Sequence, residues 1–141
     1  MNKISIRFYN NHEVRAVWSD DDSRWYYSAT DVVRAINDET DYVKAGNYWR
    51  WLKKKLAAQG IQPVSDTHEF KLVGPDGKKR VADVMDDNGI QMLAKHYPNN
   101  RANEFLDWFT YSDNTIDGQS RMKAYDLFES GMLNKLEPGS I

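Results

Sequence analysis

Residues 42–60, YVKAGNYWRWLKKKLAAQG, are the stretch around which the rest of the chain is organised. At the helical period of about 100° per residue, one line of apolar side chains runs along it. The line consists of Ala45, Trp49, Leu52 and Leu56, with Tyr42 and Tyr48 at its edges. Gly60 stops this pattern and Pro63 follows, as is typical of a helix end. The stretch therefore predicts one amphipathic helix whose apolar stripe is buried.

The rest of this predicted helix surface is cationic and carries one large aromatic side chain. Its cations are Lys44, Arg50, Lys53, Lys54 and Lys55. Trp51 falls among them, away from the apolar stripe. A cationic surface with an accessible Trp can hold a phosphate chain and stack a base. The alternative interpretation is a solvated charged face whose second Trp packs on a neighbouring hairpin.

The composition indicates a folded domain. The 141 residues fit one domain with room for an appendage, and 40% apolar residues with 13% aromatics are enough for a core. Because cysteine is absent, neither a disulfide nor a thiolate metal site can form. The N-terminal MNKISIRFYN lacks the apolar core of a signal peptide, and no apolar run approaches the roughly 20 residues of a membrane helix. We therefore expect a cytoplasmic protein without a membrane partner.

The net charge of −2 hides an uneven distribution. Residues 44–80 hold nine Lys or Arg and three Asp or Glu, so this segment carries +6 and the rest of the chain −8. A basic middle in an acidic chain suggests a surface that faces a polyanion. The acidic ends could instead fold back and neutralise it.

An alternating run opens the chain. Residues 4–8 place Ile and Phe side chains on one face and Ser5 and Arg7 on the other, the pattern of a half-buried strand. Residues 14–18 are β-prone and follow a turn-rich Tyr-Asn-Asn-His stretch, so the two runs predict a first hairpin. A third short strand is predicted at residues 24–27.

A second hairpin is predicted after the helix. Residues 69–73 and 78–84 are strand-like and are separated by Gly-Pro-Asp-Gly, a strong turn signal. The tip of this hairpin is basic, with Lys78, Lys79 and Arg80.

The periodic segments predict about five helices in all. They cover residues 28–37, 42–60, 86–98, 99–112 and 119–132. The predicted caps are Ser28 with Asp31 as a capping-box-like pair, Thr40 or Asp41, and Asp86 or Asp87. The expected class is α+β, with two hairpins of short antiparallel strands packed with these helices in a single compact domain. Residues 1–112 are predicted to form this domain, and residues 113–141 a C-terminal helical appendage or a linker to an absent domain.

The sequence shows no catalytic constellation. His12, His68 and His96 lie apart and lack the spacing of metal ligands. Nucleophile-elbow and phosphate-loop signatures are also missing. The expectation is a binding module that is not an enzyme and that uses no metal and no cofactor.

Several short motifs resemble the N-terminal domain of the BRO family, found in phage antirepressors and baculovirus BRO proteins. They are the strand Glu13-Val14-Arg15-Ala16-Val17, the aromatic strand Trp25-Tyr26-Tyr27, the helix start Thr30-Asp31-Val32-Val33, the strand pair around Leu72–Val84 and the helix start Asp86–Ile90. The likeness covers roughly residues 4–112. It implies a compact α+β domain linked with DNA binding or with regulation of phage-type repressors, and it supplies no catalytic residue. One departure is Ala35-Ile36-Asn37-Asp38, where the family helix ends in a Leu-Gly turn.

The C-terminal residues 113–141 resemble the segment that leads into Fic-type domains in some bacterial proteins. This chain contains no His-Pro-Phe motif, so it cannot itself perform nucleotidyl transfer. The resemblance implies the N-terminal module of a longer protein or a stand-alone relative.

Two functions are therefore expected. The first is a DNA-binding regulatory module of the phage antirepressor type, whose contacts to double-stranded DNA would come from Lys44, Arg50, Trp51, Lys53, Lys54, Lys55, Lys78, Lys79 and Arg80. The second is a protein-interaction module that controls a repressor, or an attached or partner Fic-type domain. In that function the basic surface meets an acidic protein face, and Trp51 is a buried anchor of the interface.

Overall fold

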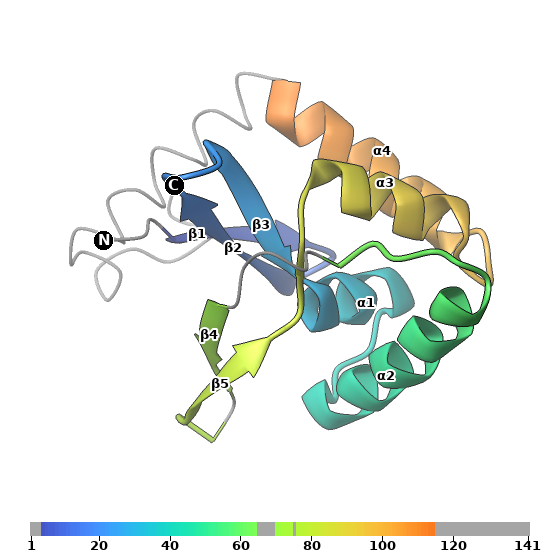
Figure 1. Cartoon of the computed structure of the whole chain (residues 1–141), viewed down its shortest axis with the longest axis horizontal. Coiled ribbons are helices and arrows are strands. Elements are labelled where there is room, and N and C mark those ends of the chain that lie inside the picture. The colour runs from blue at the N-terminus through green and yellow to red at the C-terminus, as the bar shows by residue number, and fades with distance from the viewer. Residues whose placement is uncertain (1–3, 65–69, 75, 115–141) are drawn as a thin grey trace.

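The structure is a computed structural model that describes residues 4–64, 70–74 and 76–114, with side chains described as far as Thr110. The elements in chain order are β1 (Ile4–Tyr9), β2 (His12–Ser19), β3 (Arg24–Ser28), α1 (Ala29–Asn37), α2 (Tyr42–Ala58), β4 (Phe70–Val73), β5 (Lys79–Ala82), β6 (Val84–Met85), α3 (Asp87–Lys95) and α4 (Arg101–Asn114). These helices and antiparallel strands confirm the α+β class (Figure 1). Four helices lie in the described part of the chain, and the fifth predicted helix, at 119–132, lies outside it.

The larger sheet is antiparallel and has the strand order β1-β2-β3-β6. The predicted first hairpin is confirmed as β1 and β2, which turn at Asn10 and Asn11. These two residues have φ values of 50° and 67°, which asparagine tolerates better than most residues. The predicted third strand is β3, which pairs with β2.

The predicted second hairpin is confirmed as β4 and β5, which form a separate two-stranded sheet. The prediction of one continuous strand over residues 78–84 is wrong, because β5 ends at Ala82 and β6 pairs with β3 in the larger sheet. Asp83 lies between the two short strands. Its carbonyl oxygen accepts a hydrogen bond from the Ala29 N–H at 3.0 Å, which holds the start of α1 beside this change of sheet.

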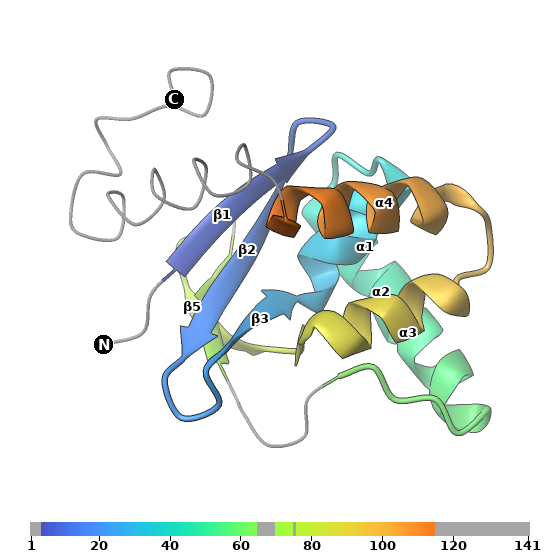
Figure 2. The same cartoon turned by 90° about the horizontal axis from the view of Figure 1, so that it is seen from above.

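The core lies between the larger sheet and the helices. Figure 2 shows the four helices on one side of that sheet. Phe105 and Phe109 of α4 meet Tyr9 and Tyr27 of the sheet edge-on, with ring centroids 5.2 and 5.0 Å apart. The β4–β5 hairpin packs on the opposite face, where the Phe70 ring lies 5.7 Å from that of Tyr26. The helices and the hairpin therefore cover different faces of one sheet.

In β1 the polar face is more deeply buried than the apolar face. An alternating strand usually buries its apolar face. Ser5 and Arg7 are 0% and 5% exposed, whereas Ile4 is 43% exposed. The Arg7 guanidinium donates a hydrogen bond to the Tyr27 hydroxyl at 2.8 Å and lies 5.0 Å from the centre of its ring. The hydrogen bond and the aromatic ring both help to offset the cost of burying this cation.

The second helix forms as its apolar period predicts. Its buried residues are Ala45, Trp49, Leu52 and Leu56, with Tyr42 and Tyr48 half-buried at the edges of the stripe. Asp41 is the N-cap, and its carboxylate accepts from the Val43 N–H at 2.8 Å. The helix ends at Ala58, and Gly60 follows with a φ of 76°. Local period and local capping together account for this helix.

The first helix ends without the glycine that the family resemblance implies. Asp38 adopts the left-handed conformation there, with φ 52° and ψ 44°, and its N–H bonds the Ala35 carbonyl. Glycine is the usual residue at such a helix end, and aspartate is one of the few others that visit this region. Asn37 accepts a hydrogen bond from the Tyr97 hydroxyl at 2.8 Å, so this turn also contacts the segment after α3.

A close backbone approach fixes the start of α3. Asp86 is its N-cap, and the Asp86 carboxylate accepts from the Gly89 N–H at 2.9 Å. A Cβ atom at Gly89 would lie 2.2 Å from the Pro63 carbonyl oxygen and 2.8 Å from the Met85 Cβ. Only glycine fits this contact, which ties the loop after α2 to α3.

Candidate nucleic-acid interface

The predicted contact residues of α2 lie on two flanks of the helix. Because successive residues of a helix turn by about 100°, Arg50 and Lys53 share one flank of α2. This flank faces the β4–β5 hairpin. We call this the groove flank. Lys44, Trp51 and Lys55 lie with Tyr48 on the other side, which we call the Trp51 flank. Lys54 lies between the flanks. The structure therefore does not gather the predicted residues of α2 into one patch.

The groove flank is tied to the hairpin by one carboxylate. The Lys53 Nζ lies 2.9 Å from the Asp83 Oδ2, and the Trp49 Nε1–H donates to the same oxygen at 2.8 Å. Both residues reach Asp83 from α2, across a separation of at least 30 residues in the chain. Asp83 therefore neutralises one predicted cation and orients the buried indole.

The hairpin cations are exposed, and one of them is paired within the hairpin. Lys78, Lys79 and Arg80 are all exposed. The Arg80 Nη1 donates to the Asp76 Oδ1 at 2.9 Å, and Asp76 also accepts from the Lys78 N–H at 3.1 Å. The hydrogen bond from Arg80 is the main reason that the pKa of Asp76 falls from 3.8 to about 2. Arg80 is thus less available to an external anion than its two lysine neighbours.

Trp51 is 49% exposed and is held in place by its own helix. Its ring lies 5.4 Å from that of Tyr48, and the Lys55 Nζ lies 5.1 Å from its centre. Tyr48 in turn lies 6.2 Å from the Tyr97 ring. Burial raises the pKa of both tyrosines. The ring contacts of Trp51 among the described residues come from Tyr48 and Lys55 of α2 itself.

Within the described residues, carboxylates neutralise only two of the eight predicted cations, namely Lys53 through Asp83 and Arg80 through Asp76. Lys44, Arg50, Lys54, Lys55, Lys78 and Lys79 form no ion pair in that part of the chain. The acidic groups of the described residues therefore leave most of this basic surface uncovered.

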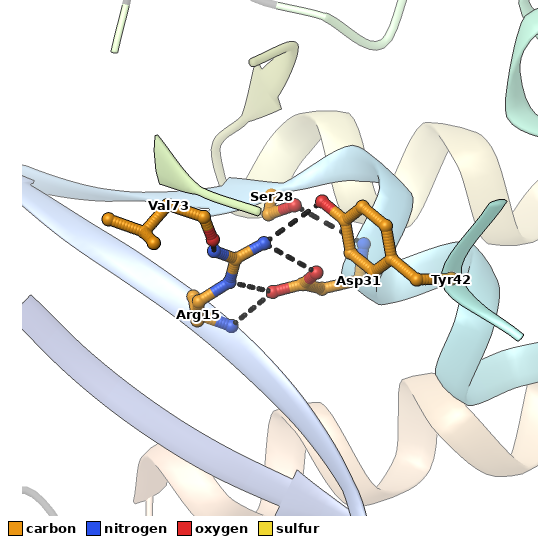
Figure 3. Close-up of polar contacts among 5 residues, drawn as sticks. All are labelled: Arg15, Ser28, Asp31, Tyr42 and Val73. Atoms are coloured by element: carbon orange, nitrogen blue, oxygen red, sulfur yellow. Dashed lines mark hydrogen bonds and ion pairs between the residues drawn. The ribbon is translucent and has the colours of Figure 1, made fainter. Parts of the chain in front are cut away.

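A buried cluster that the sequence did not predict lies beside this surface (Figure 3). Arg15 of β2 and Asp31 of α1 form a two-pronged ion pair. The Nε donates to Oδ2 at 2.7 Å and the Nη2 to Oδ1 at 3.0 Å. The Arg15 backbone N–H donates to the same carboxylate at 3.0 Å. The side chains are only 15% and 3% exposed. The ion pair gives a structural role to the strand that carries Arg15 and to the helix start that carries Asp31.

The same guanidinium joins two further elements. Its Nη1 donates to the Val73 carbonyl at 2.6 Å and its Nη2 to the Tyr42 hydroxyl at 3.1 Å. We call Arg15, Asp31, Tyr42 and Val73 the Arg15 hub, since it links β2, α1, α2 and β4. Burial opposes the charge on Arg15, but the hydrogen bonds and the charge of Asp31 outweigh it and raise the pKa of Arg15.

Asp31 departs from the predicted capping box. The Ser28 hydroxyl caps α1 as expected and accepts from the Asp31 N–H at 3.2 Å. The Asp31 carboxylate, however, is committed to Arg15. The charge of Asp31 still lies in the first turn of α1, where it suits the helix dipole.

A groove of about 540 Å³ lies between α2 and the hairpin. Its lining includes Val43, Gly46 and Arg50 of α2 and Arg80, Val81 and Ala82 of β5. A second hollow of about 670 Å³ lies beside the Arg15 hub and shares Tyr42, Val43 and Gly74 with the groove. The groove flank of α2 therefore borders a concave surface, and Trp51 lines neither of these two hollows.

The described residues contain no group of three or more His, Asp or Glu placed to hold a metal ion. No helix among them combines the length and apolar character needed to cross a bilayer. No family model, curated protein or solved structure matches this chain.

Proposed function

We propose that this chain is a non-catalytic DNA-binding regulatory module of the type implied by its resemblance to the BRO N-terminal domain, acting in the cytoplasm. The observation that carries the proposal is α2. This helix exposes five cations along its 17 residues and contains no Asp or Glu. Such a surface attracts a phosphate backbone irrespective of base sequence. The hairpin adds Lys78 and Lys79, which have no ion pair among the described residues.

The decisive experiment is binding of random-sequence duplex DNA, followed by fluorescence anisotropy across a salt series. We expect a dissociation constant in the micromolar range. The logarithm of the association constant should fall linearly with the logarithm of the salt concentration, with a slope of about −0.9 for each phosphate neutralised. With about five to seven contacts the slope would lie near −5 or −6. Absence of binding even at low salt would overturn the proposal.

The structure decides which lysines to change. Lys53 is a poor choice, because its loss also frees Asp83. A variant with Lys54→Gln, Lys78→Gln and Lys79→Gln tests the surface beside the hairpin, and one with Lys44→Gln and Lys55→Gln tests the Trp51 flank. Lys95→Gln, an exposed change on α3, is the control. The set that contacts DNA should reduce the salt slope by about one unit for each contact removed.

A protein-interaction module controlling a repressor or a Fic-type domain is the second candidate, and the exposure of Trp51 favours it. A half-exposed Trp braced by Tyr48 has the character of an interface anchor. Binding of a protein through this ring should be weakened by Trp51→Ala and change little with moderate salt. Binding of DNA should respond most to salt and to the lysine changes.

A further inference from the structure

The groove between α2 and the hairpin has an apolar surface that the fold leaves open. Val43 on α2 is 67% exposed and Val81 on β5 is 56% exposed, and both line this groove. These are high values for valine, a residue that is usually buried. The apolar surface lies on the side of α2 away from Trp51, so the groove is a separate feature from the aromatic anchor.

Gly46 keeps this groove open. It lies in the interior of α2, where glycine is the least favourable residue after proline. A Cβ atom at this position would meet nothing within 4 Å, so the packing of the described residues gives no reason for glycine. Gly46 lines the groove, and its missing side chain lets another chain approach the helix backbone there.

The strand β5 offers a main chain that can pair with an added strand. The Gly74 N–H donates to the Lys78 carbonyl at 2.9 Å, which marks these two as a hydrogen-bonded pair. Because such pairs alternate along an antiparallel ladder, Lys79 and Val81 point their N–H and C=O groups away from β4. The sheet has two strands, so this edge of β5 has no strand beside it among the described residues.

The charge of the groove selects the chemistry of its occupant. Arg80 is neutralised by Asp76, and Asp83 by Lys53. Arg50 also lines the groove, and its guanidinium donates a hydrogen bond to the neutral amide oxygen of Asn47. Arg50 is therefore the charged group of the lining that has no ion pair within the described residues. An unpaired guanidinium favours an acidic ligand.

We propose that this groove binds an extended, acidic segment of a partner protein. The segment adds a strand at the free edge of β5, places an aliphatic side chain between Val43 and Val81, and sets a carboxylate against Arg50. Main-chain pairing supplies the affinity. The aliphatic side chain between the two valines and the carboxylate against Arg50 together supply the specificity. This second binding activity goes beyond the proposed binding of DNA and does not depend on it.

The experiment begins with a phage-displayed library of random peptides panned against the full chain. We expect the enriched peptides to share an acidic residue with aliphatic residues at alternate positions. One synthetic peptide of that consensus is then titrated into the protein and into Gly46→Gln, Arg50→Gln and Ala58→Gln. Gly46→Gln fills the groove and removes an unfavourable helical glycine, so it should fold at least as well as the parent. Ala58→Gln places the same side chain on an exposed position of the same helix, outside the groove lining.

The proposal predicts that Gly46→Gln and Arg50→Gln each lower the affinity for the peptide by about tenfold or more, the size of one strong interface contact. Ala58→Gln should leave this affinity unchanged. Amide resonances of Lys79 and Val81 should shift on peptide binding. Enrichment of no acidic consensus, or equal binding to Gly46→Gln, would overturn the proposal. The proposal is also overturned if Gly46→Gln weakens the binding of duplex DNA but not the binding of any peptide. The groove would then belong to the nucleic-acid surface.

Discussion

The Arg15 hub and the cationic surface of α2 use the same kind of side chain in opposite ways. Arg15 is 15% exposed, and its guanidinium bonds Asp31, Tyr42 and Val73. Lys54 is exposed on α2 and forms no ion pair within the described residues. A cation whose partners come from the fold serves the fold, and a cation without them is available to a ligand. The net charge of the chain does not distinguish the two, but the positions of its carboxylates do.

The largest expected effect comes from breaking the hub. Asp31→Ala leaves the buried Arg15 guanidinium without its carboxylate, and removal of one partner of a buried ion pair costs about 3–5 kcal/mol. The free energy of unfolding, measured in urea, should fall by that amount.

The control is the double variant Arg15→Met, Asp31→Leu, which replaces both charges by apolar groups of similar size. It should recover most of the lost stability, because an unpaired buried charge costs more than a missing pair. A loss below about 1 kcal/mol for Asp31→Ala would mean that the pair behaves like an exposed one, and the contrast with the surface would fail.

The second prediction compares two glycines, one inside the packed region and one on the groove. Gly89→Ala should destabilise the protein by about 1–3 kcal/mol, because its Cβ would lie 2.2 Å from the Pro63 oxygen. Gly46→Ala should stabilise it by up to about 1 kcal/mol, since nothing lies within 4 Å and alanine favours the helix. Thermal unfolding of the two variants checks this. Shifts of the same sign would contradict it.

The features that could be predicted from the sequence are the local ones. The stripe of α2 follows from a period within one segment, and the caps Ser28, Asp41 and Asp86 each bond an N–H two or three residues away. The β4–β5 hairpin follows from its turn residues. In each case the signal and the structure lie within a few neighbouring positions.

The features that were missed depend on residues far apart in the chain. Arg15 and Asp31 are 16 residues apart, and Lys53 is 30 residues from Asp83. No period or spacing indicates either contact. The two-residue strand β6 is too short to show alternation, and the buried Arg7 contacts Tyr27, which lies 20 residues away in the chain. The candidate cations and their spread around α2 follow from the sequence, but the fold was needed to show which flank faces the β4–β5 hairpin and which cations are paired.

The third prediction tests how little an exposed pair contributes. Lys53 and Asp83 have side chains 47% and 35% exposed, so the Lys53→Gln change should cost only about 0.2–1 kcal/mol. Lys54→Gln, the neighbouring change without an ion pair, should leave the free energy of unfolding within error of the parent. Urea unfolding at low and at high salt should show the Lys53→Gln difference shrinking as salt rises. A loss as large as that of Asp31→Ala would remove the distinction between hub and surface.

The smallest effect concerns Asp76 at the hairpin tip, and it is a titration. The hydrogen bond from Arg80 lowers the pKa of the Asp76 carboxyl to about 2 from an ordinary 3.8. Because the pKa is lower in the folded state, the contribution of this pair to stability is fully present above the ordinary pKa and is lost as the pH falls through about 2. Carboxyl NMR should show Asp76 titrating near pH 2, and Arg80→Gln should return its midpoint towards 3.8 while leaving the pairing of β4 with β5 intact. A titration midpoint of Asp76 near 3.8 in the parent protein would show that Arg80 does not form this hydrogen bond with Asp76 in solution. Arg80 would then join Lys78 and Lys79 as a cation free to meet a ligand, and the available surface of the hairpin would be larger by one charge.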